Sequence, residues 1–462
     1  MLSLTVAVAI LVGAVLAWLG VQHRTRTIAS RPRPPVTLAV LPRSVDAAGG
    51  PVDAREKAFL DGFASAGAEI VQVTPLLSTT SKSSTASRST STSTSTTGTA
   101  ATTQCKRILI TGGRGFVAAY VIRRYLKQQQ QSSSENGLLH VHVLDLQLPD
   151  PTSTATDAIG QAVYQPSITY IRADITNKEQ MKIATRGMDV VLHMASLLPS
   201  VGVSRDTFER VNVRGVETVL AACRENGVKA LVYTSSATVL LDLHNKSIEN
   251  ADEDHPYPRQ HIDDYTATKA AAERIVLKAN TPSFATCILR PSAVFGLGDK
   301  VLLDMLVRGQ TPVYLGKGNE LLDYVHGDSV AQGHVLASER LAPGSKAAGQ
   351  IYHICTGKPV MYRKFNGDGT GDKTLSHWGY KHPSSLPLPI ATTMARLNEF
   401  VHSVTGSAPF GLALSLTAID YTQRTYWFSV EKARRDLGYD PLDSLEALVS
   451  DVKTFQKTML AA

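Results

Sequence analysis

Tyr265 and Lys269 are the two residues whose types and spacing point most directly to chemistry. Both lie in a segment with helical composition, YTATKAAAERIVLKAN, and residues four apart share one face of a helix. A tyrosine that acts as a base at neutral pH needs a pKa about 3 units below the ordinary value, equivalent to about 4 kcal/mol, and an adjacent ammonium supplies part of this. The alternative is a solvated pair on a helix surface, since 15 tyrosines give about one chance match to this spacing.

A pair of serines, Ser235 and Ser236, ends the apolar run that precedes this helix. A serine at such a strand end can hold the oxygen of a substrate hydroxyl while Tyr265 takes its proton. Ser236 is favoured over Ser235 for this role. The sequence contains no pattern that supports a serine–histidine–aspartate nucleophile or a metal site.

A second site is predicted where the first strand ends in TGGRGFVA (111–118). Gly112 and Gly115 allow a tight turn that brings backbone N–H groups and a helix N-terminus close to a pyrophosphate. The next strand ends in Asp145, whose carboxylate can accept both ribose hydroxyls and would repel a 2′-phosphate. This pattern predicts a dinucleotide site with NAD favoured over NADP. A bound nicotinamide would add positive charge near the tyrosine of the first site. The alternative for Asp145 is a surface residue that ends a strand.

Two further strand ends are expected to line the same crevice, because ligands bind at the carboxyl ends of parallel strands. Asp174 and Ile175 follow the third strand, and HMAS (193–196) follows the fourth. Asp174 could receive the adenine amino group or could serve as the N-cap of the next helix.

The elements that position these residues alternate between strand and helix. Six short apolar runs are predicted as strands: RILIT, HVHVLDL, ITYIRAD, MDVVLHMAS, ALVYTSS and ATCILRPS. Four segments between them have helical patterns: FVAAYVIRRYLKQQQ, NKEQMKIATRG, RVNVRGVETVLAACRENG and YTATKAAAERIVLKAN. This alternation predicts an α/β fold with a doubly wound parallel sheet over residues 105–298. Residues 299–462 are less regular and are expected to form a smaller substrate-binding cap, with 350–358 returning to the sheet.

The N-terminal part has a different character. Leu2 to Val21 is twenty residues without a charge, long enough for a transmembrane helix, and Arg24 and Arg26 follow at once. These arginines favour a cytosolic location for the rest of the chain. The alternative is a cleaved signal peptide, but no basic residue precedes the run. Residues 1–35 are therefore interpreted as a membrane anchor with a basic flank.

Residues 36–104 join the anchor to the catalytic region. Their first part has no assigned role, whereas residues 78–104 contain 20 Ser or Thr among 27 positions and are predicted to be a disordered linker. The formal net charge is +7, of which four charges come from the arginines of residues 1–35. The remainder has no basic-aromatic stripe, so a nucleic-acid partner is not expected. The four cysteines show no CxxC spacing and are predicted to be core thiols.

The sequence resembles the extended short-chain dehydrogenase/reductases, within the 3β-hydroxysteroid dehydrogenase group. The motifs that carry the resemblance are TGGRGFVA (111–118), VLDLQ (143–147), HMAS (193–196), RVNVRGVETVL (210–220), YTSSATV (233–239), YTATK (265–269) and RPSAVFGLGDK (290–300). The resemblance implies a Rossmann domain and catalytic roles for Tyr265, Lys269 and Ser236. The NAD contacts that it implies come from Gly112, Gly115, Phe116, Val117, Asp145, Asp174, Ile175, His193, Ala195, Ser196, Asn212, Tyr265, Lys269 and Pro291.

Within this group the sequence is most similar to the sterol-4α-carboxylate 3-dehydrogenases (decarboxylating). This similarity implies NAD-dependent oxidation of the 3β-hydroxyl of a 4α-carboxysterol, followed by decarboxylation, at the cytosolic face of the endoplasmic reticulum membrane. A homodimer or other enzymes of sterol demethylation are the partners that it implies. The alternatives are a 3β-hydroxysteroid dehydrogenase/isomerase, an NAD(P)-dependent reductase of another apolar alcohol, or a dinucleotide-binding scaffold. The helical segment 389–404 is expected either to face the core or to dip into the membrane interface.

Overall fold

The computed structural model describes residues 69–70, 106–131, 139–150, 165, 167–299, 313–365, 384–410 and 414–461. The predicted anchor and the Ser/Thr-rich linker lie outside these residues. Within them, no helix has the length and apolar character needed to cross a bilayer. Cys223, Cys287 and Cys355 are buried free thiols, which confirms the prediction for these three cysteines.

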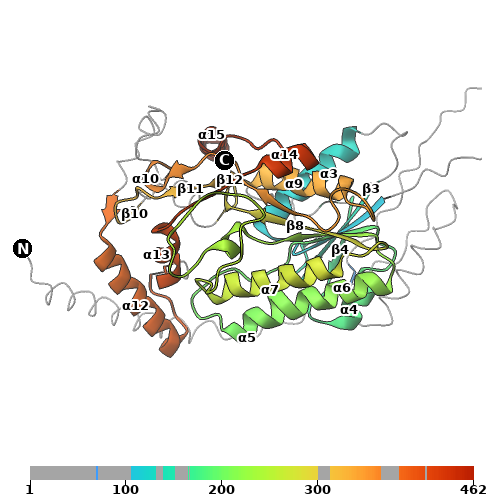
Figure 1. Ribbon diagram of the computed structural model, residues 1–462, viewed down its shortest axis with the longest axis horizontal. Coiled ribbons are helices and arrows are strands. Elements are labelled where there is room, and N and C mark those ends of the chain that lie inside the picture. Colours follow the sequence, from blue (N-terminus) through green and yellow to red (C-terminus); the bar gives the residue numbers. More distant parts are fainter. Residues whose placement is uncertain are drawn as a thin grey trace, which may run out of the picture.

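An eight-stranded sheet forms the centre of the molecule (Figure 1). In spatial order its strands are β1 (Glu69–Ile70), β4 (Ile168–Arg172), β3 (Leu139–Asp145), β2 (Lys106–Thr111), β5 (Val190–His193), β6 (Ala230–Thr234), β8 (Ala285–Pro291) and β13 (Ile351–Ile354). All pairs are parallel except that of β1 with β4. Each of the six predicted apolar runs contains one of these strands. The runs are nearly continuous in apolar residues because both faces are covered, and every residue of β8 is buried.

Helices cover both faces of the sheet (Figure 1). One face carries α3 (Phe116–Gln131), α9 (Gly327–Arg340) and α14 (Glu431–Leu437), and the other carries α4 (Lys178–Ala184), α6 (Gly215–Glu225) and α7 (Asp264–Ala279). A short helix α5 (Arg205–Phe208) and a π-helical turn η1 (Glu209–Arg214) lead into α6. Each face has its own apolar cluster, so the sheet separates two cores in the predicted doubly wound arrangement.

The smaller elements lie toward the left end of the view (Figure 1). The strand pairings are β14 (Val360–Met361), β11 (Leu321–Leu322), β16 (Thr425–Phe428) and β7 (Ser247–Ala251) in one sheet, β10 (Val313–Leu315) with β15 (Ser384–Leu386), and β12 (Tyr324–His326) with β9 (Ala293–Phe295). The remaining helices are η2 (Ala237–Leu240), α10 (Tyr362–Phe365), α12 (Leu388–Thr405), α13 (Leu416–Thr422) and α15 (Ser444–Ala461). Pairing of β7 with β16 joins the C-terminal region to the segment that precedes α7.

The parallel register brings the predicted site segments to one edge of the main sheet. Thr111 of β2 pairs with His193 of β5, which pairs with Tyr233 of β6. The glycine turn, the 194–200 loop and the serines after β6 therefore leave the sheet side by side. This edge is the place where an α/β sheet of this kind binds ligands.

Candidate active site

The glycine turn between β2 and α3 is shaped for close approach of another group. Gly112 has a φ of +67°, and a Cβ there would lie 2.7 Å from the Cα of Ala195. A side chain at this position would therefore be both strained and obstructed. The Gly115 N–H donates to the Gly112 carbonyl at 2.9 Å, which closes the turn at the N-terminus of α3. Helix α3 then presents its first-turn N–H groups toward this edge, which suits a pyrophosphate.

Asp145 closes one side of this turn. Its Oδ2 accepts the backbone N–H of Arg114 at 3.0 Å, and its Oδ1 accepts that of Leu146 at 2.8 Å. The carboxylate is thereby held against the glycine turn, as the sequence predicts for a residue that contacts a ribose. Asp145 is the last residue of β3 and is half-buried, so its contact with a ribose stays a prediction beside the alternative of a surface residue that ends a strand.

Asp174 lies in the turn between β4 and α4. Its Oδ1 accepts both the N–H and the hydroxyl of Thr176 at 2.8 Å. The N-cap of α4 is Asn177, whose side chain accepts the N–H of Gln180. The alternative that Asp174 caps this helix is therefore wrong, because the helix begins three residues later than that alternative requires. Ile175 is buried in the core of this face.

The loop after β5 is fixed from two sides. The Oγ1 of Thr111 lies 2.8 Å from Nδ1 of His193 and accepts the N–H of Ala195 at 3.2 Å. Burial and then the nearby Lys269 lower the pKa of His193 to about 3, so this imidazole is neutral at physiological pH. The side chain of Asn212 is buried and makes two bonds to the backbone of Leu197, at 2.8 and 3.2 Å.

These contacts show that His193 and Asn212, which the sequence resemblance places among the NAD contacts, help to position the loop after β5. Asn212 binds the backbone of the loop that faces the glycine turn, whereas His193 contacts Thr111, whose Oγ1 accepts two N–H groups of that loop. Ser196 lies in the same loop and is half-buried. Phe116 and Val117 begin α3 and pack on the core, and Pro291 ends β8. The structure thus brings the predicted cofactor residues to one edge of the sheet, on both sides of Gly112.

Ser236 and Tyr265 form the centre of the second predicted site. Ser236 is the N-cap of η2, and its Oγ lies 2.7 Å from Oγ1 of Thr238. Burial raises the pKa of Tyr265, and a hydrogen bond with Ser236 partly opposes that increase. Ser235 is buried with no hydrogen bond to its hydroxyl among the described residues. Of the two serines, only Ser236 affects the pKa of this phenol, and its role in holding a substrate oxygen stays a prediction.

Lys269 lies one turn further along α7 and is buried. Its Nζ donates to the carbonyl of Thr234 at 2.6 Å and lies 4.8 Å from the ring centroid of Tyr233. Burial lowers the pKa of Lys269 to about 7, although the carboxylate of Glu273 raises it in part. The solvated-pair alternative for Tyr265 and Lys269 is wrong, because both side chains are buried.

The lowered pKa of Lys269 gives stability a defined pH dependence. In the unfolded chain lysine titrates near 10.4, whereas in the folded protein Lys269 titrates at about 7, so the unfolded state binds more protons between these values. Compared with Lys269→Met, the wild-type protein should gain stability as the pH rises from about 7 to about 10, by at most about 1.4 kcal/mol per pH unit. Urea unfolding of both proteins across this range measures the difference. Parallel curves would contradict the depressed pKa.

A buried ion pair between Glu273 and Arg290 joins α7 to β8. Glu273, two turns after Tyr265, accepts two bonds from the guanidinium of Arg290, at 2.9 and 2.7 Å. Tyr257 donates a third bond to this carboxylate at 2.6 Å. Both charged side chains are at most 1% exposed. The negative charge of Glu273 is also the one that favours the protonated form of Lys269. The sequence interpretation did not single out this pair, since its two partners are distant in sequence.

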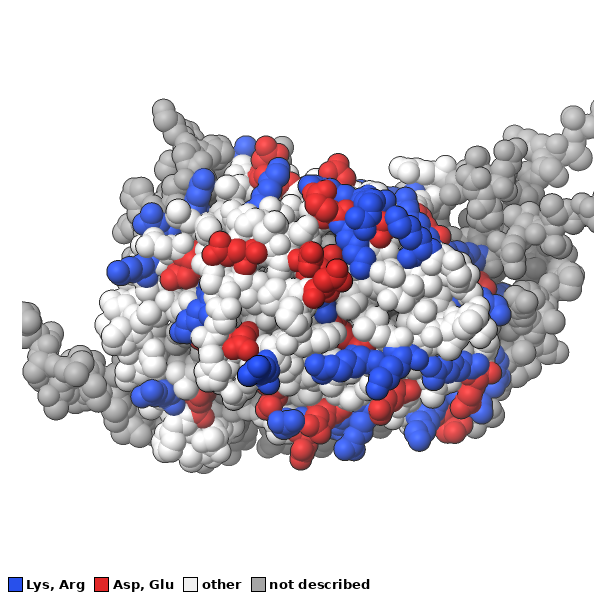
Figure 2. Space-filling model, in the orientation of Figure 1, with Lys and Arg blue, Asp and Glu red and all other residues white. Residues whose placement is uncertain are grey.

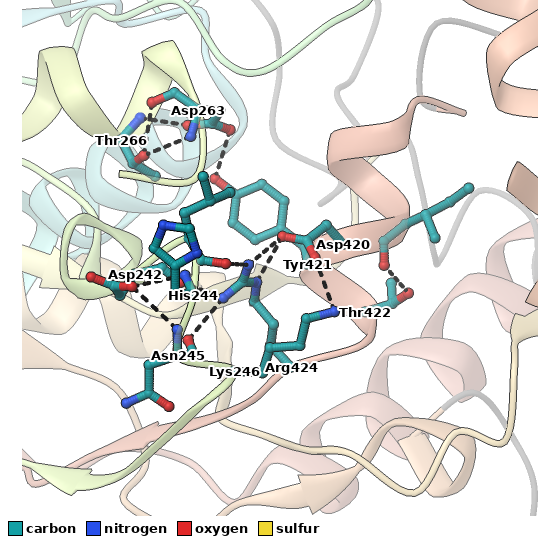
Figure 3. Close-up of polar contacts among 12 residues, drawn as sticks. Asp242, His244, Asn245, Lys246, Asp263, Thr266, Asp420, Tyr421, Thr422 and Arg424 are labelled. Carbon is teal, nitrogen blue, oxygen red and sulfur yellow. Dashed lines mark hydrogen bonds and ion pairs between the residues drawn. The ribbon is translucent and has the colours of Figure 1, made fainter. Parts of the chain in front are cut away.

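The head of α7 is held by the C-terminal region (Figure 3). Asp263 is the N-cap: its Oδ1 accepts the N–H of Thr266 at 2.7 Å, while its Oδ2 accepts the hydroxyl of Tyr421 from α13 at 3.0 Å. Arg424 is 1% exposed, binds Asp420 twice and donates to backbone carbonyls of the 242–245 loop. These contacts fix α13 on the helix that carries Tyr265. An Asp-x-x-Thr capping pattern at 263–266 was available in the sequence, but nothing in it indicated Tyr421.

A cavity of about 330 Å³ opens beside Tyr265. It is walled by the 199–203 loop, by Phe208, by the start of α7 and by residues of α12 and α13, including Glu399, His402 and Ser403. Gly202 has a φ of +82°, and a Cβ there would collide with the ring of His402, so this glycine lets α12 close against the loop. Tyr265 therefore lines a cavity between the start of α7 and the helices α12 and α13 of the cap.

Known proteins are similar to this chain in sequence and in fold. The model of the 3-beta hydroxysteroid dehydrogenase/isomerase family matches residues 109–390. The 3beta-hydroxysteroid-dehydrogenase/decarboxylase isoform 1 of Arabidopsis thaliana is 34% identical over 355 residues, which cover 73% of this chain and 76% of that protein. The sterol-4-alpha-carboxylate 3-dehydrogenase, decarboxylating, of Candida albicans is 32% identical over 361 residues, which cover 73% of this chain and 94% of that protein.

Among solved structures, the dTDP-glucose 4,6-dehydratase DesIV of Streptomyces venezuelae superposes with a TM-score of 0.56 at 21% identity, covering 76% of this chain and 97% of that one. This likeness supports the Rossmann-like parallel sheet of the extended short-chain dehydrogenase/reductase fold. The sequence match is more specific than the likeness of fold, because the family model covers residues 109–390. The chain belongs to the 3-beta hydroxysteroid dehydrogenase/isomerase family.

Proposed function

We propose that the protein oxidises the 3β-hydroxyl of a 4α-carboxysterol to the 3-ketone with NAD and that the product then loses CO₂. The observation that carries this proposal is the placement of Tyr265 in the lining of the cavity, in a chain from this family. Relatives at 30–33% identity whose names describe decarboxylating sterol-4-alpha-carboxylate dehydrogenases supply the substrate class.

Tyr265 is the proposed base. Its phenolate takes the proton of the substrate hydroxyl, and Ser236 holds the oxygen of that hydroxyl in place. Because burial raises the pKa of this phenol, the protein alone does not favour the phenolate. Positive charge near the phenol would favour ionisation, and Lys269, one turn further along α7, can supply it when protonated.

The residues of the glycine turn fit the proposed cofactor. Gly112 leaves the space that a side chain would fill, and Asp145 is held where it can accept ribose hydroxyls. When bound, NAD accepts the hydride that leaves C3 as the carbonyl forms. Lys269 lies near the end of β6, where it can hold the nicotinamide ribose and contribute charge beside the phenol.

The second part of the reaction needs less from the protein. Oxidation at C3 converts the 4α-carboxysterol into a β-keto acid. The C4–carboxyl bond then breaks, its electron pair forms the C3–C4 double bond, the carboxyl proton passes to the C3 oxygen to give the enol, and CO₂ leaves. Addition of a proton at C4 and loss of the hydroxyl proton then give the ketone. No further catalytic residue is required for this loss.

Asp145 should set the choice of dinucleotide. In Asp145→Asn the amide oxygen can keep one of the two backbone contacts of the side chain, and the charge that repels a 2′-phosphate is removed. The ratio of kcat/KM for NAD over NADP is expected to fall by about tenfold, equivalent to about 1.4 kcal/mol. Initial rates with both dinucleotides measure this ratio. Asp189→Asn, at a carboxylate that binds the Arg107 N–H, is a control that should keep the ratio unchanged.

We further propose that the chain is anchored in the endoplasmic reticulum membrane with its catalytic region in the cytosol. Support comes from the uncharged run Leu2–Val21 and from the arginines that follow it. An apolar sterol partitions into the bilayer, so an enzyme held there meets its substrate directly.

One assay tests the proposed reaction. The full chain in detergent is supplied with NAD and either a 4α-carboxysterol or the matching 3β-hydroxysterol without the carboxyl group, and NADH is followed by absorbance. Faster turnover of the carboxysterol supports the proposal. NADH from the uncharged sterol without CO₂ from the other would indicate a 3β-hydroxysteroid dehydrogenase. NAD binding without turnover of either sterol would contradict the enzyme proposal.

A further inference from the structure

The end of β6 is held from both faces of the main sheet. Thr234 is the last residue of this strand, and its carbonyl accepts a hydrogen bond from Nζ of Lys269 at 2.6 Å. Its side-chain hydroxyl lies 2.7 Å from Nε2 of His334. Lys269 belongs to α7 and His334 to α9, which lie on opposite faces of the sheet (Figure 1). One residue therefore connects the helix of the proposed catalytic pair to a helix on the far face.

The geometry of the strand explains how Thr234 reaches both helices. Successive side chains of a strand point to opposite faces of its sheet. Tyr233 packs in the apolar cluster on the α7 face, where the centroid of its ring lies 4.8 Å from Nζ of Lys269. The side chain of Thr234 therefore points to the α9 face, whereas its carbonyl stays within reach of Lys269.

The hydrogen bonds of His334 determine its tautomer. Nδ1 lies 2.8 Å from the carbonyl oxygen of Val330, one turn earlier in α9. A carbonyl oxygen can only accept, so Nδ1 carries the proton and Nε2 has the lone pair. The hydroxyl of Thr234 must then donate to Nε2. Burial lowers the pKa of His334 to about 4, so the imidazole keeps this neutral form at physiological pH.

Thr234 stands where the chain leaves the sheet toward the candidate site. Two residues later Ser236 begins η2 as its N-cap, and this serine is the one proposed to hold the substrate oxygen. The direction of the Thr234 carbonyl depends on the orientation of its peptide group. A bond from the side chain of the same residue to a fixed imidazole limits the rotation of that group. Such limits matter because small displacements of active-site groups lower reaction rates strongly.

Lys269 has few partners because it is buried. Figure 2 shows lysine and arginine side chains spread over one face of the molecule, whereas Lys269 is only 2% exposed. The titratable groups around it come from its own helix and from two strands: Tyr265 and Glu273 of α7, His193 of β5 and Tyr233 of β6. Among the described residues, the carbonyl of Thr234 is the one hydrogen-bond acceptor of its Nζ. The position of this carbonyl therefore decides where the ammonium lies.

We infer that His334 is a positioning residue for the proposed reaction: through the hydroxyl of Thr234 it directs the Thr234 carbonyl toward Lys269. This inference rests on the proposed function for the role of Lys269 beside Tyr265. His334 is absent from the cavity lining, so its effect on the reaction must pass through Thr234. An apolar side chain at position 334 would leave the buried hydroxyl of Thr234 without its acceptor, and the end of β6 would rearrange to supply another.

The first test needs no turnover. The full chain is labelled with lysine that carries ¹³C at Cε, whose chemical shift follows protonation of Nζ, and the Lys269 signal is the one absent from Lys269→Met. In Thr234→Val and in His334→Leu its titration midpoint should fall by about half a pH unit or more, because the ammonium loses a well-placed acceptor. Thr234→Ser keeps the hydroxyl and should restore the wild-type midpoint. A wild-type midpoint in both Thr234→Val and His334→Leu would overturn the inference.

Ser338→Ala is the matched control for these variants. Ser338 lies one turn after His334 in α9, is buried, and its Oγ lies 2.7 Å from the hydroxyl of Tyr125. Its replacement removes a buried hydrogen bond from the same helix without touching Thr234, so the Lys269 midpoint should stay unchanged. An equal shift in Ser338→Ala would show that any loosening of α9 moves Lys269, and would overturn the inference.

Turnover gives a second test. Thr234→Val and His334→Leu should each lower kcat about tenfold and change the KM for the sterol by less than about twofold. Because both remove the same contact, the double variant should also lose about tenfold, whereas a loss of about a hundredfold would show separate effects and overturn the inference. Valine has the shape of threonine, so Thr234→Val decides the matter if His334→Leu does not fold. Wild-type protein that oxidises no sterol would contradict the proposed function, and the Lys269 titration would still decide the role of His334.

Discussion

Replacing Tyr265 with phenylalanine is expected to lower kcat by about a thousandfold, the range in which a positioned acid–base group contributes. The variant loses the group that takes the proton but keeps the ring, which packs edge-on near Phe208 with ring centroids 6.3 Å apart. Dinucleotide affinity should change by less than about twofold, because the glycine turn lies on another element. Single-turnover kinetics and fluorescence titration with NADH measure the two effects.

The control for this variant is Tyr257→Phe. Tyr257 is also a tyrosine near α7, but its hydroxyl binds Glu273 in the core and does not reach the cavity lining. Its replacement should reduce stability more than turnover. Equal losses of turnover in the two variants, or nearly full activity of Tyr265→Phe, would remove Tyr265 from the role of base.

Replacing Arg290 with methionine should lower the free energy of unfolding by about 3–5 kcal/mol. The change leaves the Glu273 carboxylate buried with one hydrogen-bond donor, Tyr257, where the wild-type protein supplies three bonds. An unpaired buried charge costs this much because the interior cannot replace the water it has lost. Urea unfolding followed by circular dichroism gives the difference.

The double variant Arg290→Met/Glu273→Leu is the control for a charge effect. Removing both charges should recover a large part of the lost stability, because apolar side chains of similar size tolerate the same space. Arg205→Met, which breaks an exposed pair with Glu209, should leave the unfolding midpoint almost unchanged. A double variant as unstable as Arg290→Met alone would show that packing, and not charge, accounts for the loss.

The sheet could be predicted from the sequence because a parallel sheet covered on both faces needs almost uninterrupted apolar strands. The runs around Ile110, Val143 and Leu289 supply these strands, and all three residues are at most 1% exposed. The short strands of the cap could not be predicted in the same way. β11 and β14 have two residues each. Their pairing joins Leu322 to Val360, and the pairing of β11 with β16 joins Leu322 to Tyr426, so both depend on contacts between segments distant in sequence.

The placement of Tyr265 and Lys269 could be predicted because it is local, with the two residues on successive turns of one helix. The pKa values of these two side chains could not be predicted, because burial is the main cause of their shifts. Sequence spacing suggested that Lys269 lowers the pKa of Tyr265, whereas desolvation raises the pKa of this phenol and lowers that of the lysine. The hydrogen bond between Asp263 and Tyr421 could not be predicted either, because it joins residues 158 positions apart.

In the proposed reaction, each turnover oxidises C3 and leads to loss of the neighbouring carboxyl group. The most direct test supplies the full chain with NAD and a 4α-carboxysterol that carries ¹³C in the carboxyl group, and counts NADH and ¹³CO₂ from the same reaction. We expect one ¹³CO₂ for each NADH, with both absent in Tyr265→Phe. NADH with the label retained in the sterol, or ¹³CO₂ without NADH, would contradict the proposed reaction.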